Sequence, residues 1–318
     1  MERNLPELSL TDFIRGGPES RRAFSDQLMT SLQRYGFFTL RNHLVPTPLL
    51  DRAYAHCAAL FAQPVTWKSR YIGGVRGYVP FGIEHAKDSG AADLKEFWQI
   101  GPESERGLEG SNPWGLLVPA NIWPETPQGL RETFTELFQA LQNTGRVILE
   151  ALTAHLELPA GFFEPMIEER NSVLRLIHYP AVGPDVAAGA ARSAAHEDIN
   201  LITLLPAPKG PGLELLDRDG QWLSVDTHPH NLIVDSGDML ARITNDRIPS
   251  TTHRVVNPAD SAASRYSMPF FMHPNPNATL SCLPSCVGNG ARYPDILSGV
   301  FLEQRLREIG LMPPERGS

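Results

Sequence analysis

Apolar residues in the first half of the chain recur mostly at helical spacing, with β-rich runs between the periodic stretches. Between residues 21 and 35 an apolar side chain occurs every three or four positions before Gly36, which predicts an amphipathic helix and its end. In chain order, the pattern predicts a strand at 6–9, a helix at 21–35, a strand at 37–40, a helix at 49–60 and the longest helix at 126–156. Residues 71–125 are rich in glycine and proline, and they predict a loop-rich connection in which only 93–100 resembles a strand.

Beyond residue 171 the helical period gives way to short β-rich runs separated by Gly, Pro, Asn and Asp. The runs expected to form strands are SVLRLIHY, LITLLP, GLELLD, QWLSV, NLIVDSG, MLARIT, TTHRVV and RYSMPFFM. Closely spaced short strands with turn signals are typical of an antiparallel sandwich or jelly roll. A final periodic stretch predicts a helix at 296–309. The predicted fold class is mainly β with flanking helices.

Composition and charge exclude several classes of protein. With 42% hydrophobic and 20% charged residues, the 318-residue chain has the composition of a folded globular protein. Its formal net charge of −8 gives no general attraction to nucleic acid or to anionic lipid, so neither is an expected partner. The sequence shows neither a basic leader with an apolar run nor a membrane-spanning run of about 18 apolar residues. Three cysteines are too few for a disulfide framework, and these features together predict a cytoplasmic protein.

The segment AHEDINLITLL contains the most informative pair of residues, His196 and Asp198. On an extended strand, residues separated by one position project from the same face, so both side chains can hold one ion while Glu197 points away. His253 lies on another β-rich run and supplies a third candidate ligand. Two imidazoles and one carboxylate on one side of a metal suit non-haem Fe(II) oxygen chemistry, because open positions remain for a cosubstrate and O2. An isolated His-x-Asp triplet also occurs by chance, so further motifs are needed.

A second pair, Arg265 and Ser267, follows His253 by twelve and fourteen positions. The same alternation places both side chains on one face of a strand. A guanidinium with a neighbouring hydroxyl is a good receptor for a carboxylate at the end of a sandwich. The alternative is that Arg265 lies on a solvated strand face.

With these motifs in order, the chain resembles the isopenicillin N synthase-like branch of the Fe(II)- and 2-oxoglutarate-dependent dioxygenases. The resemblance extends from about residue 6 to residue 309. In the N-terminal part, the matching motifs are Tyr35-Gly36-Phe37-Phe38, Asn42-His43, Gly77-Tyr78, Asp93-Leu94-Lys95-Glu96-Phe97 and Trp123-Pro124. In the C-terminal part, they are His196-x-Asp198, Gly212-Leu213, Trp222, Val225, Gly237-Asp238, His253-Arg254-Val255 and Arg265-x-Ser267.

The resemblance implies a double-stranded β-helix, or jelly-roll core, with iron in its open end. It implies that His196, Asp198 and His253 bind Fe(II), and that Arg265 and Ser267 bind the distal carboxylate of the cosubstrate 2-oxoglutarate. Tyr179 falls where the family often has a tyrosine that helps to hold this cosubstrate. Many plant members carry Asn two positions before that tyrosine, whereas this chain has Ile177, so the contacts to 2-oxoglutarate are expected to differ.

The implied organisation has three parts. Residues 1–125 form an N-terminal α/β region packed on the core, 126–290 hold the long helix and the jelly-roll catalytic core, and 291–318 form a C-terminal helix and tail. The implied enzyme is an oxygenase that uses Fe(II), 2-oxoglutarate and O2 to hydroxylate, desaturate or cyclise a small or medium organic metabolite. Succinate and CO2 are the coproducts, and the protein is expected to be a monomer or homodimer.

Two alternatives stay open from the sequence. An iron oxidase of the isopenicillin N synthase type would use the Arg-x-Ser pair for a substrate carboxylate and would not need 2-oxoglutarate. The protein could also be a non-catalytic jelly-roll binding protein, but that hypothesis does not explain why His196, Asp198 and His253 occur together.

By the same resemblance, residues 71–100 and 292–309 are expected to recognise the substrate. Within the first range, apolar side chains suggest a partly hydrophobic pocket (Tyr78, Val79, Phe81 and Phe97). Three cations are candidates to meet a substrate carboxylate (Arg76, Lys95 and Arg192), although Arg192 could instead be a surface charge. Four other histidines are poor ligand candidates, because His178 faces away from Tyr179 and the other three are expected to lie in exposed Pro-rich turns (His228, His230 and His273). The Cys282 and Cys286 pair is a poor zinc signal, and residues 73–77 predict a flexible loop.

Overall fold

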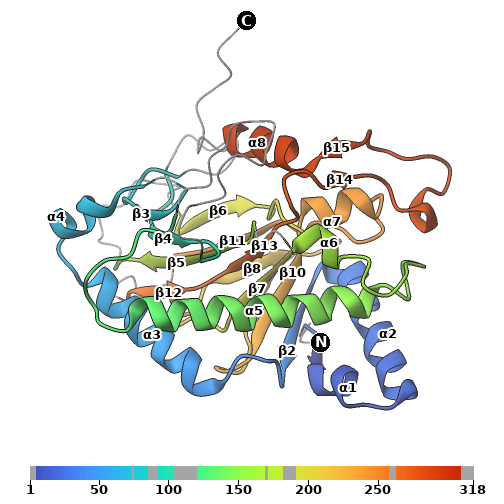
Figure 1. Cartoon of the computed structure of the whole chain (residues 1–318), viewed down its shortest axis with the longest axis horizontal. Helices are drawn as coiled ribbons and strands as arrows, with labels where there is room; N and C mark the ends of the chain where they lie inside the picture. Colours follow the sequence, from blue (N-terminus) through green and yellow to red (C-terminus); the bar gives the residue numbers. More distant parts are fainter. Residues whose placement is uncertain are drawn as a thin grey trace, which may run out of the picture.

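The computed structural model describes residues 5–73, 75–84, 92–103, 120–168, 171–181, 191–257 and 263–308. Two mainly antiparallel sheets pack face to face, and helices cover the outer face of the larger one (Figure 1). All strand pairs described are antiparallel except the parallel pair of the first two strands.

The larger sheet combines strands from both halves of the chain. Its order is β1-β2-β10-β7-β13-β5-β4-β3, with β12 also paired to β5. The strands of this sheet are β1 (Glu7–Ser9), β2 (Phe37–Arg41), β3 (Gly77–Val79), β4 (Glu96–Ile100), β5 (Val173–Tyr179), β7 (Ile202–Pro206), β10 (Leu232–Ser236), β12 (Arg265–Ser267) and β13 (Phe270–Met272). The predicted strands at 6–9, 37–40 and 93–100 are thus confirmed within a few residues.

The smaller sheet has the order β6-β11-β8-β9. Its strands are β6 (Ser193–His196), β8 (Leu213–Leu216), β9 (Trp222–Ser224) and β11 (His253–Val255). A separate hairpin pairs β14 (Thr279–Leu280) with β15 (Ile296–Leu297).

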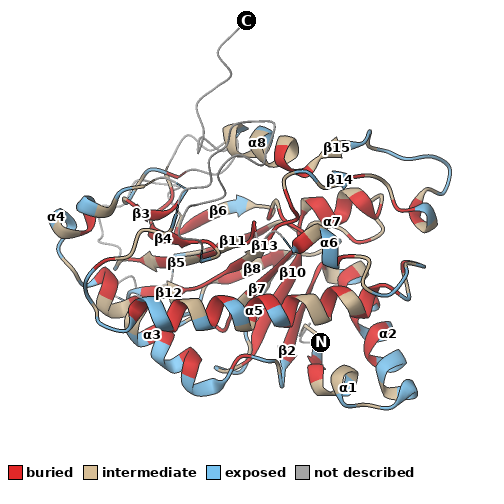
Figure 2. Cartoon of the chain, viewed as in Figure 1, coloured by how far each residue is buried: buried red, intermediate tan, exposed pale blue. Residues whose placement is uncertain are grey.

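Side-chain alternation along β5 explains how one strand serves two environments. Leu174 and Leu176 point outward into the helix-covered core, whereas Ile177 and Tyr179 join the apolar cluster between the two sheets. Arg175 shares the inner face with Ile177 and Tyr179, and all three line the cavity between the sheets. Figure 2 shows this buried layer as continuous through the strands and along one side of the helices.

The long helix α5 (Leu130–Leu152) lies across the outer face of the larger sheet (Figure 1). Phe138 packs edge-on against Phe270 of β13 at a centroid distance of 5.0 Å. Gly145 of α5 lets the helix approach the sheet, because a Cβ there would lie 2.6 Å from the sulfur of Met272. The other helices are α1 (Leu10–Ile14), α2 (Pro18–Tyr35), α3 (Thr47–Phe61), α4 (Val65–Lys68), α6 (Glu164–Ile167), α7 (Asp238–Ile243) and α8 (Ser298–Glu308), with short 3-10 turns η1 (Ser69–Tyr71) and η2 (Pro284–Cys286).

The helices predicted at 21–35, 49–60, 126–156 and 296–309 correspond to α2, α3, α5 and α8, although residue 309 lies outside the described residues. One prediction was wrong, because the run MLARIT forms helix α7 and not a strand. The run RYSMPFFM is divided into β12 and β13, since Pro269 cannot donate a ladder hydrogen bond.

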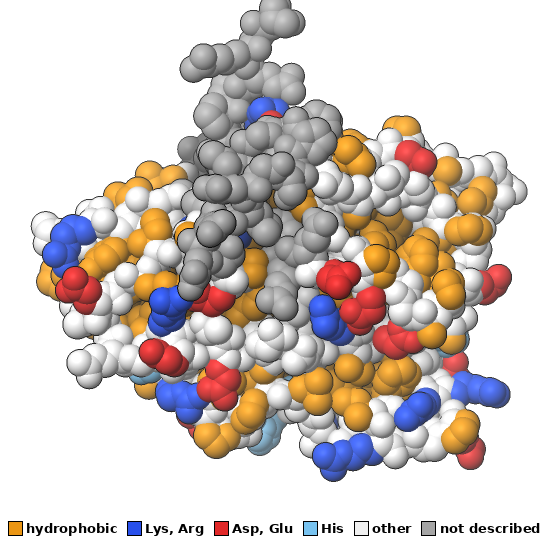
Figure 3. Space-filling view, viewed as in Figure 1, with side chains coloured by type: hydrophobic (Ala, Val, Ile, Leu, Met, Phe, Trp, Pro, Cys, Tyr) orange, Lys and Arg blue, Asp and Glu red, His pale blue; other side chains and the backbone are white. Residues whose placement is uncertain are grey.

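None of the helices in the described part of the chain is both long and apolar enough to cross a bilayer. On the face shown in Figure 3, acidic and basic side chains lie interspersed among apolar ones.

Candidate active site

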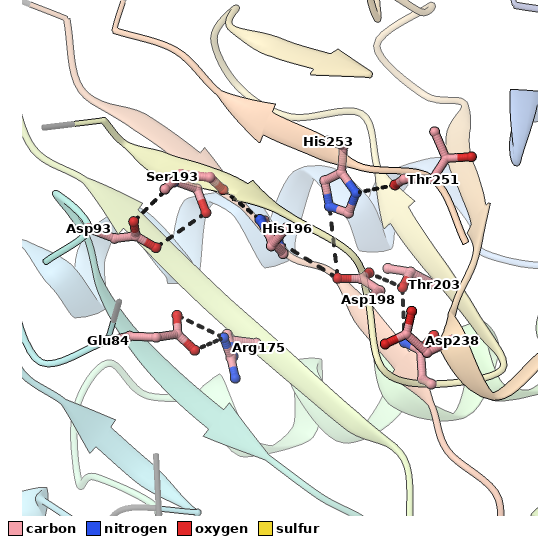
Figure 4. Close-up of polar contacts among 12 residues, drawn as sticks. Glu84, Asp93, Arg175, Ser193, His196, Asp198, Thr203, Asp238, Thr251 and His253 are labelled. Atoms are coloured by element: carbon pink, nitrogen blue, oxygen red, sulfur yellow. Dashed lines mark hydrogen bonds and ion pairs between the residues drawn. The ribbon is translucent and has the colours of Figure 1, made fainter. Parts of the chain in front are cut away.

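Three predicted ligands meet at one end of the cavity between the sheets. His196 ends β6, His253 begins β11, and the two are register partners across the smaller sheet. Asp198 lies two residues beyond β6, so it does not share an extended strand with His196 as predicted, yet it faces the same point. Its Oδ1 is 3.8 Å from Nε2 of each histidine. One ligand atom from each residue lies within 4.8 Å of the others, and the side chains point toward one another (Figure 4).

Hydrogen bonds to backbone carbonyls fix the tautomers of both histidines. Nδ1 of His196 lies 2.7 Å from the Ala194 carbonyl oxygen, and Nδ1 of His253 lies 3.2 Å from that of Thr251. Since a carbonyl oxygen only accepts, each Nδ1 carries the proton and each Nε2 keeps a free lone pair directed at Asp198. This is the form in which imidazole binds a metal.

Hydrogen bonds on the side away from the two histidines fix the orientation of the Asp198 carboxylate. Thr203 Oγ1 donates to Asp198 Oδ2 and accepts from Asn200 Nδ2 at 2.9 Å. The backbone N–H of Asp238 donates to the Asp198 carbonyl at 2.7 Å. Gly237 permits this approach, because a Cβ there would lie 2.8 Å from the Asp198 carbonyl oxygen. Oδ1 is therefore left to face the two histidines.

The electrostatics of the cluster favour a cation. Burial lowers the pKa of His253 to about 4, and the neighbouring His196 contributes to this shift, so the ring is neutral at pH 7. Asp235 of β10 also lines the cavity, and burial together with the nearby Asp198 carboxylate raises its pKa well above the usual range. Sequence reasoning missed Asp235, although the alternation in NLIVDSG places it on the same face as Ile233, which belongs to the inner apolar cluster.

The predicted carboxylate receptor lies farther along the same cavity. Arg265 and Ser267 of β12 face inward and pair in register with Tyr179 and Ile177 of β5. Arg265 is only 1% exposed; its Nε donates to the Gly210 carbonyl at 3.3 Å, and its Nη1 has no hydrogen-bond partner among the residues described. Its guanidinium carbon lies 4.9 Å from the Tyr179 ring centroid. Arg265 is thus not on a solvated face, and its buried Nη1 requires an acceptor.

A buried ion-pair cluster forms another wall of the cavity. Lys95 Nζ lies 2.6 Å from Glu84 and 2.8 Å from Asp93, and Arg175 Nη1 donates to Glu84 at 2.9 Å. Asp93 accepts from the Ala194 N–H at 3.0 Å, which ties this cluster to the strand that carries His196 (Figure 4). The sequence suggested that Lys95 could meet a substrate carboxylate, but this cation is paired within the protein. The pairing of Arg175, Glu84 and Asp93 around it was not predicted, because it is visible only in three dimensions.

Other sequence predictions have mixed outcomes. Of the apolar substrate candidates, Tyr78, Val79 and Phe97 are buried in the cores and only Phe81 is exposed. Arg76 is buried outside the cavity lining. Arg192 is not a surface charge, because it is 1% exposed.

The other histidines and cysteines considered in the sequence analysis are not part of the metal cluster. His178 hydrogen-bonds Glu96 through Nδ1 at 2.8 Å and stacks on Tyr266, which confirms that it faces away from the predicted ligands. His228 is exposed and His230 partly so, but the prediction for His273 was wrong because it is buried. Cys282 and Cys286 are free thiols. In the predicted loop at 73–77, Gly74 lies outside the described residues.

The fold and the site together define a class of non-haem iron oxygenases. Residues 170–274 match the model of the 2OG-Fe(II) oxygenase superfamily, and residues 5–126 match that of the N-terminal part of a non-haem dioxygenase in morphine synthesis. The chain is 31% identical over 308 residues to the 2-oxoglutarate-Fe(II) type oxidoreductase hxnY of Emericella nidulans, covering 92% of this chain and 86% of the relative.

Solved structures agree with the sequence matches. A protein assigned to the 2OG-Fe(II) oxygenase family from Caulobacter crescentus superimposes with a TM-score of 0.83 at 40% identity, covering 96% of this chain and 99% of that one. A full-length Neurospora crassa protein, solved in complex with alpha-KG, gives a TM-score of 0.85 at 27% identity, covering 95% and 96%.

The chain belongs to the 2OG-Fe(II) oxygenase superfamily. It has the family's double-stranded β-helix, and it is a 2-oxoglutarate-dependent dioxygenase that uses Fe(II), 2-oxoglutarate and O2. The iron oxidase that does not use 2-oxoglutarate is not favoured, since the relatives are named for 2-oxoglutarate and a structural neighbour binds it.

Proposed function

We propose that His196, Asp198 and His253 bind the iron, and that Arg265, Ser267 and Tyr179 bind 2-oxoglutarate in the same cavity. The observation that carries this proposal is the convergence of two Nε2 lone pairs and one carboxylate oxygen at one end of a cavity. Farther along that cavity lies a buried guanidinium with an unpaired Nη1. The donor set suits Fe(II), and the guanidinium suits a carboxylate.

Each side chain has a distinct task in the proposed reaction. When bound, Fe(II) and 2-oxoglutarate supply the oxidising chemistry, with succinate and CO2 as coproducts. Thr203 orients the Asp198 carboxylate, and the Ala194 and Thr251 carbonyls keep both histidines in the neutral tautomer. Arg265 and Ser267 fix the distal end of the cosubstrate. Ile177, where many plant relatives have Asn, lies in register with Ser267 and contributes an apolar contact instead.

The cavity also supports a proposal about the primary substrate. Its lining includes apolar side chains from both sheets, and the buried cations Lys95 and Arg175 are already paired with Glu84 and Asp93. The positive charges on this wall are therefore already balanced, and they do not favour a negatively charged substrate. We expect a small or medium organic molecule that is neutral at its reacting end, with hydroxylation as the main outcome. The Neurospora crassa neighbour has also been solved with thymine, and it provides a neutral example.

Binding and turnover test this function separately. Anaerobic addition of 2-oxoglutarate to the Fe(II)-loaded protein should produce a weak visible charge-transfer band. A screen of metabolites scored by succinate release should then identify substrates, with Asp198→Ala as the metal-free control. Intact metal loading with no band, or oxidation of a substrate without succinate, would contradict the proposal.

Other properties stay predictions. We propose that residues 1–125 form the N-terminal region, 126–290 the long helix and catalytic core, and 291–318 the C-terminal helix and tail. We also propose that residues 71–100 and 292–309 select the substrate. The three free thiols support a reducing, cytoplasmic location. The oligomeric state is expected to be monomer or homodimer.

A further inference from the structure

Arg192 is a buried arginine whose role the proposed reaction does not explain. It directly precedes β6, four positions before His196, and it is 1% exposed. Its Nη2 donates to the Ala263 carbonyl, and its Nε is buried with no hydrogen-bond partner in the part of the chain that the structure describes. Ala263 lies two residues before Arg265, so this contact brings Arg192 to the strand that carries the proposed carboxylate receptor.

Arg192 and Arg265 differ from three other buried cations. Lys68, Lys95 and Arg175 each form an ion pair with a buried carboxylate. Within the described ranges, no carboxylate forms an ion pair with Arg192 or Arg265. Burial lowers the pKa of Arg192, and the positive charge of Arg265 lowers it further. Among the described residues neither charge has a counterion, and because two desolvated like charges are unfavourable together, an anion bound at this end of the cavity would be stabilised.

The position of Arg192 indicates how it acts. Ser193, its neighbour in the chain, lines the cavity, whereas Arg192 is absent from the lining. Adjacent residues of an extended segment point to opposite sides, so Arg192 lies behind the cavity wall. It therefore acts on a bound anion through its charge and through the Ala263 carbonyl at the entry to β12, not by direct contact.

We propose that Arg192 is a positioning residue for the distal carboxylate of 2-oxoglutarate, and that its charge makes the cavity select dicarboxylic over monocarboxylic 2-oxo acids. This inference rests on the proposed function, because it assumes that Arg265 meets that carboxylate. It differs from the expectation that Arg192 binds a primary substrate. Its consequence is selectivity for the cosubstrate.

Calorimetric titration of the anaerobic Fe(II)-loaded protein tests the inference with two ligands. 2-Oxopentanoate has the same chain length as 2-oxoglutarate but ends in a methyl group. Arg192→Gln should weaken 2-oxoglutarate binding by about tenfold and change 2-oxopentanoate binding by less than about twofold. Arg192→Lys keeps the charge and should restore most of the preference. Arg192→Met is a second neutral variant should the Gln variant fail to fold, and thermal melts check all three.

The outcomes separate a charge effect from a packing effect. Equal weakening of both ligands, or equal losses in the Lys and neutral variants, would show that Arg192 only supports the fold around Ala263, and would overturn the inference. Normal 2-oxoglutarate binding by the neutral variants would also overturn it, without affecting the proposed function. Failure of the wild-type protein to bind 2-oxoglutarate would overturn both.

Discussion

Replacing Glu84 with Gln tests whether the buried ion-pair cluster beside the cavity stabilises the protein through charge. The Glu84 side chain is 7% exposed and accepts from Lys95 Nζ at 2.6 Å and from Arg175 Nη1 at 2.9 Å. Burial alone would raise the pKa of Glu84, but the charges of Arg175 and Lys95 lower it from 4.5 to about 2. That difference corresponds to about 3 kcal/mol of folding free energy at neutral pH.

The sign of the pH dependence follows from the direction of this shift. Because the folded-state pKa lies below the unfolded value, the stabilisation is fully present above 4.5 and is lost as the pH falls toward 2. Glu84→Gln should therefore lower the free energy of unfolding by about 3 kcal/mol at pH 7. The difference in unfolding free energy between wild type and this variant should be about 1.4 kcal/mol smaller at pH 3.5 than at pH 7.

Urea unfolding of both proteins at a series of pH values measures this gap. Glu136→Gln is a matched control, since Glu136 pairs with Arg52 at 2.5 Å but its side chain is 56% exposed. The control should lose less than about 1 kcal/mol, with little pH dependence. A Glu84→Gln gap that stays constant from pH 7 to 3.5 would refute the electrostatic explanation, and so would equal behaviour of the two variants.

Three further sets of substitutions probe the site and the core. Asp198→Ala should abolish iron binding with the fold intact, as measured by metal content and thermal melting, whereas Arg265→Met should keep the iron and weaken 2-oxoglutarate binding by roughly tenfold or more. Parallel loss of metal and cosubstrate in the Arg265 variant would contradict these roles. Gly237→Ala should lower iron affinity, because the added Cβ would lie 2.4 and 2.5 Å from two Asn200 oxygens and 2.8 Å from the Asp198 carbonyl oxygen, so the segment that carries Asp198 would have to shift; unchanged metal content would argue against this tight approach. Tyr54→Phe should cost about 1 kcal/mol, because the Tyr54 hydroxyl contacts two buried carbonyl oxygens at 2.9 and 3.0 Å; an unfolding free energy equal to wild type would contradict this.

Some features could be predicted from the sequence because they depend on local spacing. The helical spacing of apolar residues over 126–156 predicted α5. The order of the motifs along the chain predicted that His196, Asp198 and His253 form one metal site, and the structure brings these three residues together. The run MLARIT failed because six residues with mostly apolar side chains fit either a strand or a short buried helix. After Gly237 the chain begins α7 instead, and Met239, Leu240 and Ile243 are all buried.

Other features depend on contacts between distant segments, which spacing does not encode. His273 stands in a proline-rich turn that looks exposed, but the turn is held against α6, with the Asn275 N–H donating to the Met166 carbonyl at 2.5 Å. Lys95 looks like a free cation until Glu84 and Asp93 are placed around it. The burial of Arg192 likewise depends on the approach to β12, about 70 residues away in the chain.

The place of β2 in the larger sheet has a consequence for synthesis of the protein. β2 lies between β1 and β10, and Leu40 pairs with Leu232. A ribosome that adds about 5–20 residues per second needs roughly 10–40 s to reach β10 after β2 has been made. During that time the apolar side chains of β2 have no sheet to join, and one edge of the strand offers free hydrogen-bonding groups. α2 packs on β2 and is made before it, so this helix can cover these side chains until β10 is available.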